Sequence, residues 1–260
     1  MVLDPTRRFT NRVSNYLRYR PRYPAAFIPL IETECGLTSE SLIADLGSGT
    51  GFLSELFLQH GNPVIGVEPN TEMRLAGEAQ LASYPGFSSV NAVAEATTLP
   101  DHSIDFVVAG QAFHWFDRQR ARQEFRRILK PDGWVVLAWN GFRAESSPLM
   151  AAYQDLILRH GTDYTEVRRE LDDRELVSFF APGVCKSAHY NFQQFFDYQG
   201  LEGRLLSSSF VPEPDDPNYE PMLRDLREMF AAHQEDGKVA FEYDAELYYG
   251  QLPASGKAEG

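Results

Sequence analysis

The stretch LIADLGSGTGFL, residues 42–53, constrains the fold of this chain more than any other. Its apolar start is typical of a short buried strand, and apolar residues at helical spacing follow its glycines. A strand that turns directly into a helix brings unpaired backbone N–H groups and the positive end of a helix to one point. The glycines are Gly47, Gly49 and Gly51. A tight turn accounts for one of them, and three together favour a ligand lying close to the backbone.

Short apolar and β-branched runs alternate with helical patterns from about residue 42 to residue 140. This alternation predicts a parallel sheet with helices on its faces. The expected strands are residues 42–46, 64–67, 90–93, 106–109 and 134–139. The first expected helix ends at Gly61, and the second begins at a cap formed by Asn70. The third runs from a cap formed by Asp117 through Leu129 and is followed by a turn at residues 130–133.

The composition changes after Gly141. Ser147 as cap and Pro148 in the first turn predict a helix that ends at Gly161. Residues 163–180 have an irregular helical pattern. Residues 186–196 and 238–251 are expected to be strands, and residues 219–234 a helix.

The overall charge disfavours nucleic acid as a partner. The chain has 24 Lys and Arg against 37 Asp and Glu, a net charge of -13, so its average surface repels phosphate backbones. No apolar run approaches the roughly 20 residues of a membrane helix. Cys35 and Cys185 are isolated and the six histidines are scattered, which predicts reduced thiols, no metal site and a cytoplasmic location.

The glycine loop excludes two nucleotide-binding motifs. Its pattern is G-x-G-x-G, with Phe52 at the position where the dinucleotide motif G-x-G-x-x-G needs its last glycine. No lysine follows, which excludes a P-loop. Asp45 would repel a pyrophosphate but attract an ammonium group. Glu68, at the end of the second expected strand, is placed to accept hydrogen bonds from two ribose hydroxyls.

Five motifs in order carry a family resemblance: DLGSGTG, VIGVEPN, AVAEATTLP, IDFVVAGQAFHWFD and LKPDGWVVLAW. Over residues 40 to 140 the chain resembles class I S-adenosylmethionine-dependent methyltransferases with a type 11 domain. The nearest resemblance is to the branch that includes trans-aconitate methyltransferase and the ubiquinone/menaquinone C-methyltransferases. The segment YLRYRPRYP also resembles the N-terminal arm of that branch, through Tyr16, Arg20, Pro21, Tyr23 and Pro24.

The resemblance implies a Rossmann-like, doubly wound α/β sheet of seven strands, mostly parallel with an antiparallel last strand. It divides the chain into an N-terminal arm or lid with the first helix (1–40), an S-adenosylmethionine-binding core (41–140), a substrate-side helical insert with the final strands (141–252) and a flexible tail (253–260). It also implies methyl transfer from S-adenosyl-L-methionine to a small organic molecule. The cofactor-binding residues it implies are Tyr16, Arg20, Asp45, Gly47, Ser48, Gly49, Gly51, Glu68, Pro69, Met73, Ala94, Glu95, Gln111 and Ala112. The family often has Asp at the position of Ala94.

His114 is the candidate catalytic residue, because QAFHWF follows the fourth expected strand at the mouth of the site. It would serve as a base or orient the acceptor. Packing of His114 and Trp115 in the pocket wall is the simpler alternative. Two other functions stay open, a non-catalytic S-adenosylmethionine-binding protein and a nicotinamide-dependent oxidoreductase. The acceptor and the oligomeric state do not follow from the sequence.

Overall fold

The computed structural model describes residues 12–162, 164 and 173–253. In this part of the chain, seven strands form one sheet in the order β3-β2-β1-β4-β5-β7-β6, so the expected Rossmann-like α/β fold is confirmed. The strands are β1 (Ile43–Leu46), β2 (Val64–Val67), β3 (Phe87–Val90), β4 (Ile104–Gly110), β5 (Leu129–Phe142), β6 (Lys186–Phe196) and β7 (Val239–Gln251).

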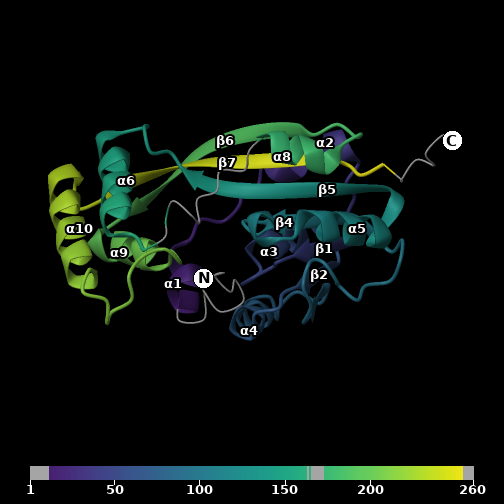
Figure 1. Ribbon diagram of the computed structural model, residues 1–260, viewed down its shortest axis with the longest axis horizontal. Helices are drawn as coiled ribbons and strands as arrows, with labels where there is room; N and C mark the ends of the chain where they lie inside the picture. Colours follow the sequence, from purple (N-terminus) through teal and green to yellow (C-terminus); the bar gives the residue numbers. More distant parts are fainter. Residues whose placement is uncertain (1–11, 163, 165–172, 254–260) are drawn as a thin grey trace.

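The direction of the strands is also as expected. The pairs β1–β2, β1–β4, β2–β3 and β4–β5 are parallel, and β7 runs antiparallel to both β5 and β6. The chain order reverses between β1 and β4, which is the point where open sheets of this kind bind ligands. The long strands β5, β6 and β7 reach past the short ones toward a group of helices at the left end of Figure 1.

Helices cover the sheet and extend it at one end. They are α1 (Val13–Tyr19), α2 (Phe27–Cys35), α3 (Phe52–His60), α4 (Thr71–Gln80), the 3-10 turn η2 (Phe113–Trp115), α5 (Arg118–Ile128), α6 (Pro148–His160), α8 (Asp173–Phe180), α9 (Tyr198–Leu206) and α10 (Tyr219–His233). The three expected N-caps are confirmed, because Asn70, Asp117 and Ser147 accept hydrogen bonds from the backbone N–H three residues later. Of the segment 163–180, only Tyr164 and α8 lie within the described residues.

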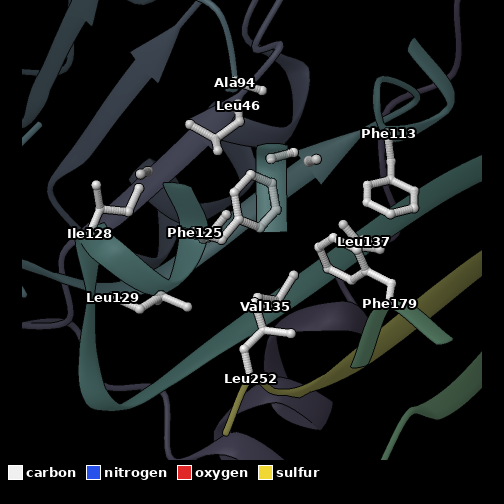
Figure 2. Close-up of a cluster of buried hydrophobic side chains, with 14 of the residues drawn as sticks. Leu46, Ala94, Phe113, Phe125, Ile128, Leu129, Val135, Leu137, Phe179 and Leu252 are labelled. Atoms are coloured by element: carbon white, nitrogen blue, oxygen red, sulfur yellow. The ribbon is translucent and has the colours of Figure 1, made fainter. Parts of the chain in front are cut away.

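Two hydrophobic clusters lie on opposite faces of the sheet. Ile43 packs in the cluster beneath α2 and α3, whereas its neighbour Ala44 packs in the cluster beneath α5 and α8. This follows from the alternation of side chains along a strand. In the second cluster, Phe125 of α5, Leu137 of β5 and Phe179 of α8 gather around one interior (Figure 2). The sheet is therefore covered on both sides, as a doubly wound fold requires.

A third cluster joins α6, α9 and α10 to the ends of β6 and β7. Helix α9 is not indicated by the sequence pattern, because Gly200 and Gly203 lower helix propensity. Tertiary contacts explain it. Asp197 caps the helix by accepting a hydrogen bond from Gly200 N at 2.7 Å, and Gly203 leaves no room for a side chain because the ring of Tyr19 lies against it.

Three expected boundaries are wrong. The third strand is residues 87–90, not 90–93, because its four residues pair in register with the four of β2, while Val93 only bridges Ala96. Helix α5 ends at Ile128, and Leu129 already pairs with β4. The expected turn at residues 130–133 is a bulge within β5, since Ile104 faces Leu129 but Phe106 faces Trp134.

Within the described ranges, no helix is both long and apolar enough to cross a membrane.

Leu137→Ala tests the importance of the cluster drawn in Figure 2. Leu137 is fully buried in β5, so truncation leaves a cavity and should lower the free energy of unfolding by about 2–5 kcal/mol. Urea unfolding followed by circular dichroism measures the change. Leu158→Ala is the matched control, because Leu158 on α6 is 50% exposed and should change stability by less than about 0.5 kcal/mol. Equal losses in both variants would contradict this account of the core.

Candidate functional site

A cavity of about 180 Å³ opens at the carboxyl ends of β1, β2 and β4, where the strand order reverses. The loop after β1 forms its floor, and the loops after β2 and β4 form two walls. Residues of the N-terminal arm also line it. Its lining residues are Tyr16, Arg20, Pro21, Tyr23, Asp45, Gly47, Ser48, Gly49, Thr50, Phe52, Leu53, Glu68, Pro69, Asn70, Met73, Val93, Ala94, Glu95, Gly110, Gln111, Ala112, Trp115, Phe116 and Asn140.

All three glycines of the loop after β1 have positive φ, at 69°, 55° and 85°. A Cβ at Gly47 would lie 2.6 Å from Cβ of Ala112, and one at Gly51 would lie 2.6 Å from Cδ1 of Leu81. Backbone conformation and packing therefore require these glycines without any ligand. The expectation that a tight turn accounts for only one of them is wrong.

Asp45 is the most deeply buried acid of the cavity, with 1% of its surface exposed. Its Oδ2 accepts a hydrogen bond of 2.7 Å from Ser54 Oγ, whereas its buried Oδ1 has no hydrogen-bond partner among the described residues. Burial raises the pKa of Asp45 to about 7, with the charge of Glu68 adding to the rise and the Ser54 bond opposing it. A cationic ligand group beside Oδ1 would stabilise the ionised form.

Glu68 holds the loops of the cavity together. Its Oε2 accepts a hydrogen bond of 2.9 Å from Gly49 N, and its Oε1 accepts one of 2.8 Å from Asn70 N. Burial raises the pKa of Glu68, and these two bonds oppose the rise. Each carboxylate oxygen can accept one further hydrogen bond, so the predicted ribose contacts and this structural role are compatible.

Gln111 carries backbone strain at the end of β4. Its φ is 56°, which is unusual for a residue other than glycine. The conformation is held by hydrogen bonds of 2.9 Å from Gln111 N to Ala138 O and from Gln111 Nε2 to Asn140 O. Strain of this kind concentrates at functional sites.

Asn140 was not among the residues expected in the site. It lines the cavity, and its buried Oδ1 has no partner within the described ranges. Asn140 directly follows the apolar run of residues 134–139, near the carboxyl end of a strand. This position could have indicated a site residue from the sequence alone.

The N-terminal arm crosses the cavity. Helix α1 stops at Tyr19 because Arg20 precedes a proline and takes an extended conformation, with φ -70° and ψ 143°. Arg20 Nε donates to Ser207 Oγ at 2.9 Å, and its Nη2 donates to Ser207 O and Ser208 Oγ at 3.2 and 3.1 Å. The Tyr16 ring lies 5.5 Å from that of Phe52. The arm thus joins the glycine loop to the end of α9.

The fold brings together most of the cofactor residues implied by the sequence. All except Gly51 line the cavity; Gly51 lies behind it, as the N-cap of α3. His114 does not line the cavity. Its ring centroid lies 4.7 Å from that of Trp115, and Trp115 forms the wall instead.

One group of potential metal ligands, His189, Asp244 and Glu246, occurs in the part of the chain that the structure describes. It lies on the paired strands β6 and β7, and none of its members lines the cavity.

The cavity lies within a recognisable domain. Residues 44–137, which supply its floor and most of its walls, match the family model described as a methyltransferase domain. The chain contains a class I methyltransferase domain. S-adenosyl-L-methionine is the methyl donor of this family.

The relatives of the methyltransferase domain agree with this assignment. The chain is 31% identical over 156 residues to an uncharacterized methyltransferase-like protein of Schizosaccharomyces pombe, covering 60% of this chain and 59% of the relative. It is 34% identical over 137 residues to an uncharacterized methyltransferase of Mycobacterium bovis, covering 53% and 54%. The chain therefore spans between about half and three fifths of the length of these relatives.

The fold of the methyltransferase domain and its flanking helices is also found in a solved structure. A protein of Anaeromyxobacter dehalogenans assigned to the type II methyltransferases superposes with a TM-score of 0.70 and 22% identity. The match covers 91% of this chain and 100% of that one, so it supports the arrangement of the helices and strands beyond residues 44–137.

The cavity of the methyltransferase domain fits the donor chemically. Three of its lining residues have buried oxygens that lack a partner among the described residues: Asp45 Oδ1, Thr50 Oγ1 and Asn140 Oδ1. Unpaired buried acceptors are costly unless a ligand pairs with them. S-adenosylmethionine offers an ammonium group, two ribose hydroxyls and an adenine amino group as donors.

The affinity for S-adenosylmethionine should depend on pH through Asp45. Below about pH 7 the Asp45 carboxyl is mostly protonated, so binding of an ammonium group at Asp45 must release a proton, and affinity should fall as the pH falls. Calorimetric titration at pH 6 and pH 8, in buffers of different ionisation enthalpy, measures the released proton. We expect release at pH 6 and almost none at pH 8. Asp45→Asn is the matched control and should bind weakly without this pH dependence; an unchanged profile would exclude Asp45 as its source.

Proposed function

We propose that this protein transfers a methyl group from S-adenosyl-L-methionine to a small organic molecule. The observation that carries the proposal is the unpartnered, buried Oδ1 of Asp45 beside the glycine loop of the methyltransferase domain. An acid at this point suits the ammonium of the donor and repels the pyrophosphate of a nicotinamide dinucleotide. We further propose membership of the branch that includes trans-aconitate methyltransferase and the ubiquinone/menaquinone C-methyltransferases, supported by the arm residues Tyr16, Arg20 and Tyr23.

Each part of the donor has a complementary part of the cavity. Asp45 would bind the ammonium group, and the free lone pairs of Glu68 would accept hydrogen bonds from the ribose hydroxyls. Pro69, Met73 and Ala94 offer apolar surface for the adenine ring. Gln111 and Ala112, after β4, would lie near the methionine end.

The bound donor supplies a methyl group on a positively charged sulfur, which leaves as a neutral thioether. The task of the protein is then to align the acceptor and to exclude water. The rings of Tyr16, Phe52 and Trp115 and the arm residues enclose the cavity for this purpose.

In this proposal Asp45 and Glu68 are engaged by the donor, and the phenols of the lining are not bases near neutral pH. Burial raises the pKa of Tyr16 and of Tyr23, so both phenols stay protonated and act as hydrogen-bond donors. His114 stands outside the lining. This supports an acceptor that is already nucleophilic, such as a carboxylate, over one that must lose a proton to the enzyme.

Parallel calorimetric titrations with S-adenosylmethionine, S-adenosylhomocysteine and NADH test the proposal. Both adenosyl compounds should bind in the micromolar range, and NADH should not bind. Binding of NADH alone would overturn the proposal in favour of an oxidoreductase. Donor binding without methyl transfer to any compound of an acceptor library would favour a non-catalytic binding protein.

The variants His114→Ala and Trp115→Ala test which of these two neighbouring residues contributes to ligand binding. Trp115 lines the cavity and His114 does not, so Trp115→Ala should weaken binding of S-adenosylhomocysteine by roughly tenfold, a loss of about 1.4 kcal/mol. His114→Ala should keep the dissociation constant within about twofold. A larger loss in His114→Ala than in Trp115→Ala would restore His114 as a site residue.

A further inference from the structure

Two arginines from distant parts of the sequence lie together at the arm side of the cavity. Arg20 follows α1 in the arm and lines the cavity, and Arg204 belongs to α9. Both reach the same hydroxyl: Arg20 Nη2 donates to Ser208 Oγ at 3.1 Å, and Arg204 Nη1 donates to it at 3.4 Å. Ser208 is fully buried. The two guanidinium groups are therefore close neighbours, with Arg20 half-buried and Arg204 buried.

Neither guanidinium group has a carboxylate partner among the described residues. Arg20 donates to Ser207 and Ser208, and Arg204 donates to Ser208 and, at 2.9 Å, to Tyr243 Oη. Arg204 is only 3% exposed, and its Cζ lies 5.1 Å from the centroid of the Phe241 ring. Burial and the charge of Arg204 lower the pKa of Arg20 to about 10. Buried positive charges are normally paired with an anion, and these two arginines have no carboxylate beside them among the described residues.

Arg12 gives a contrast within the same region. Its guanidinium group binds the carbonyl oxygens of Ser208 and Val211 and the carboxylate of Glu213, at 2.5, 2.8 and 2.7 Å. Arg12 therefore has a structural role with a counter-ion, fastening the arm to the end of α9. Arg20 and Arg204 have no such counter-ion, although they contact the same short segment.

Tyr153 provides a third unsatisfied polar group beside the arginines. Its side chain is 1% exposed, and its hydroxyl has no hydrogen-bond partner in the described residues. Its ring centroid lies 4.8 Å from that of Phe241, the same ring that Arg204 contacts. Burial raises the pKa of Tyr153 to about 12, and the charges of Arg204 and Arg20 oppose the rise. Tyr153 and Arg204 both lie outside residues 44–137, the segment of the family match.

We infer that Arg20, which lines the cavity, binds a carboxylate of the methyl acceptor with the support of the buried Arg204 and Tyr153, so that the acceptor is an organic acid. The inference rests on the proposed function. The guanidinium group of Arg20 suits a carboxylate through its charge and its paired N–H donors, and the charge of the neighbouring Arg204 adds to the attraction. Arg20 makes the contact from the cavity, while Arg204 adds positive charge behind it.

The donor's own carboxylate is the other source of the same chemistry, and two measurements separate the sources. The first is the dissociation constant of S-adenosylhomocysteine, which carries the donor carboxylate. The second is methyl transfer from radiolabelled S-adenosylmethionine to a library of organic acids and their matched carboxamides. We expect label in acids and not in the matched amides.

Arg204→Met should raise the KM for the labelled acid at least about tenfold and leave the dissociation constant of S-adenosylhomocysteine within about twofold. Arg20→Lys keeps the positive charge but loses the paired N–H donors and should raise the same KM several-fold, which keeps the test valid if Arg204→Met does not fold. Arg159→Met, at an exposed site on α6, is the matched control and should change neither value.

Three results would overturn the inference: equal transfer to acids and amides, no transfer to acids although the donor binds, or a loss of S-adenosylhomocysteine affinity in Arg204→Met as large as the loss for the acid. The last result would assign the subsite to the donor. Failure of the unaltered protein to bind S-adenosylhomocysteine at all would reject the proposed function instead, so the two failures are distinguishable.

Discussion

The carboxylate of Glu68 is the interaction on which the site depends. It accepts hydrogen bonds from Gly49 of the glycine loop and from Asn70, the cap of α4, and so fixes two loops that leave neighbouring strands. Asn70 in turn accepts a hydrogen bond from Met73 N, which begins the helix that carries Met73 into the cavity. Because these bonds are made within the protein, the cavity has its shape before a ligand binds, and binding need not supply the cost of ordering it.

Charges of opposite sign lie on two sides of this cavity. Asp45 and Glu68 belong to the parallel strands, and Arg20 and Arg204 to the arm and to α9. Each group is buried enough to have a perturbed pKa, and perturbed values concentrate where proteins do chemistry. Under the proposed function, the two acids would bind the cationic methyl donor, and the arginines would favour an anionic acceptor.

The sequence was sufficient for much of the fold and for part of the site. The strands β1, β2, β6 and β7 and the three N-caps follow from short-range patterns, since buried strands and caps depend on neighbouring residues. The position of β3 was wrong because an edge strand is set by the register of its partner β2, and residues 130–133 were misread because a bulge has the composition of a turn. Helix α9 was missed because its two glycines are required by contacts with other elements.

What the sequence alone determined is the proposed donor side of the cavity. Asp45, the glycine loop and Glu68 lie within one strand–helix–strand unit, so local spacing specifies their geometry. What only the tertiary structure decided is the proposed acceptor side. Arg20 and Ser207 are 187 positions apart, and Tyr153 and Arg204 come from helices that no local pattern joins to the arm. They meet because β5, β6 and β7 extend past the other strands, and α6 and α9 pack against the ends of β6 and β7 beside the arm.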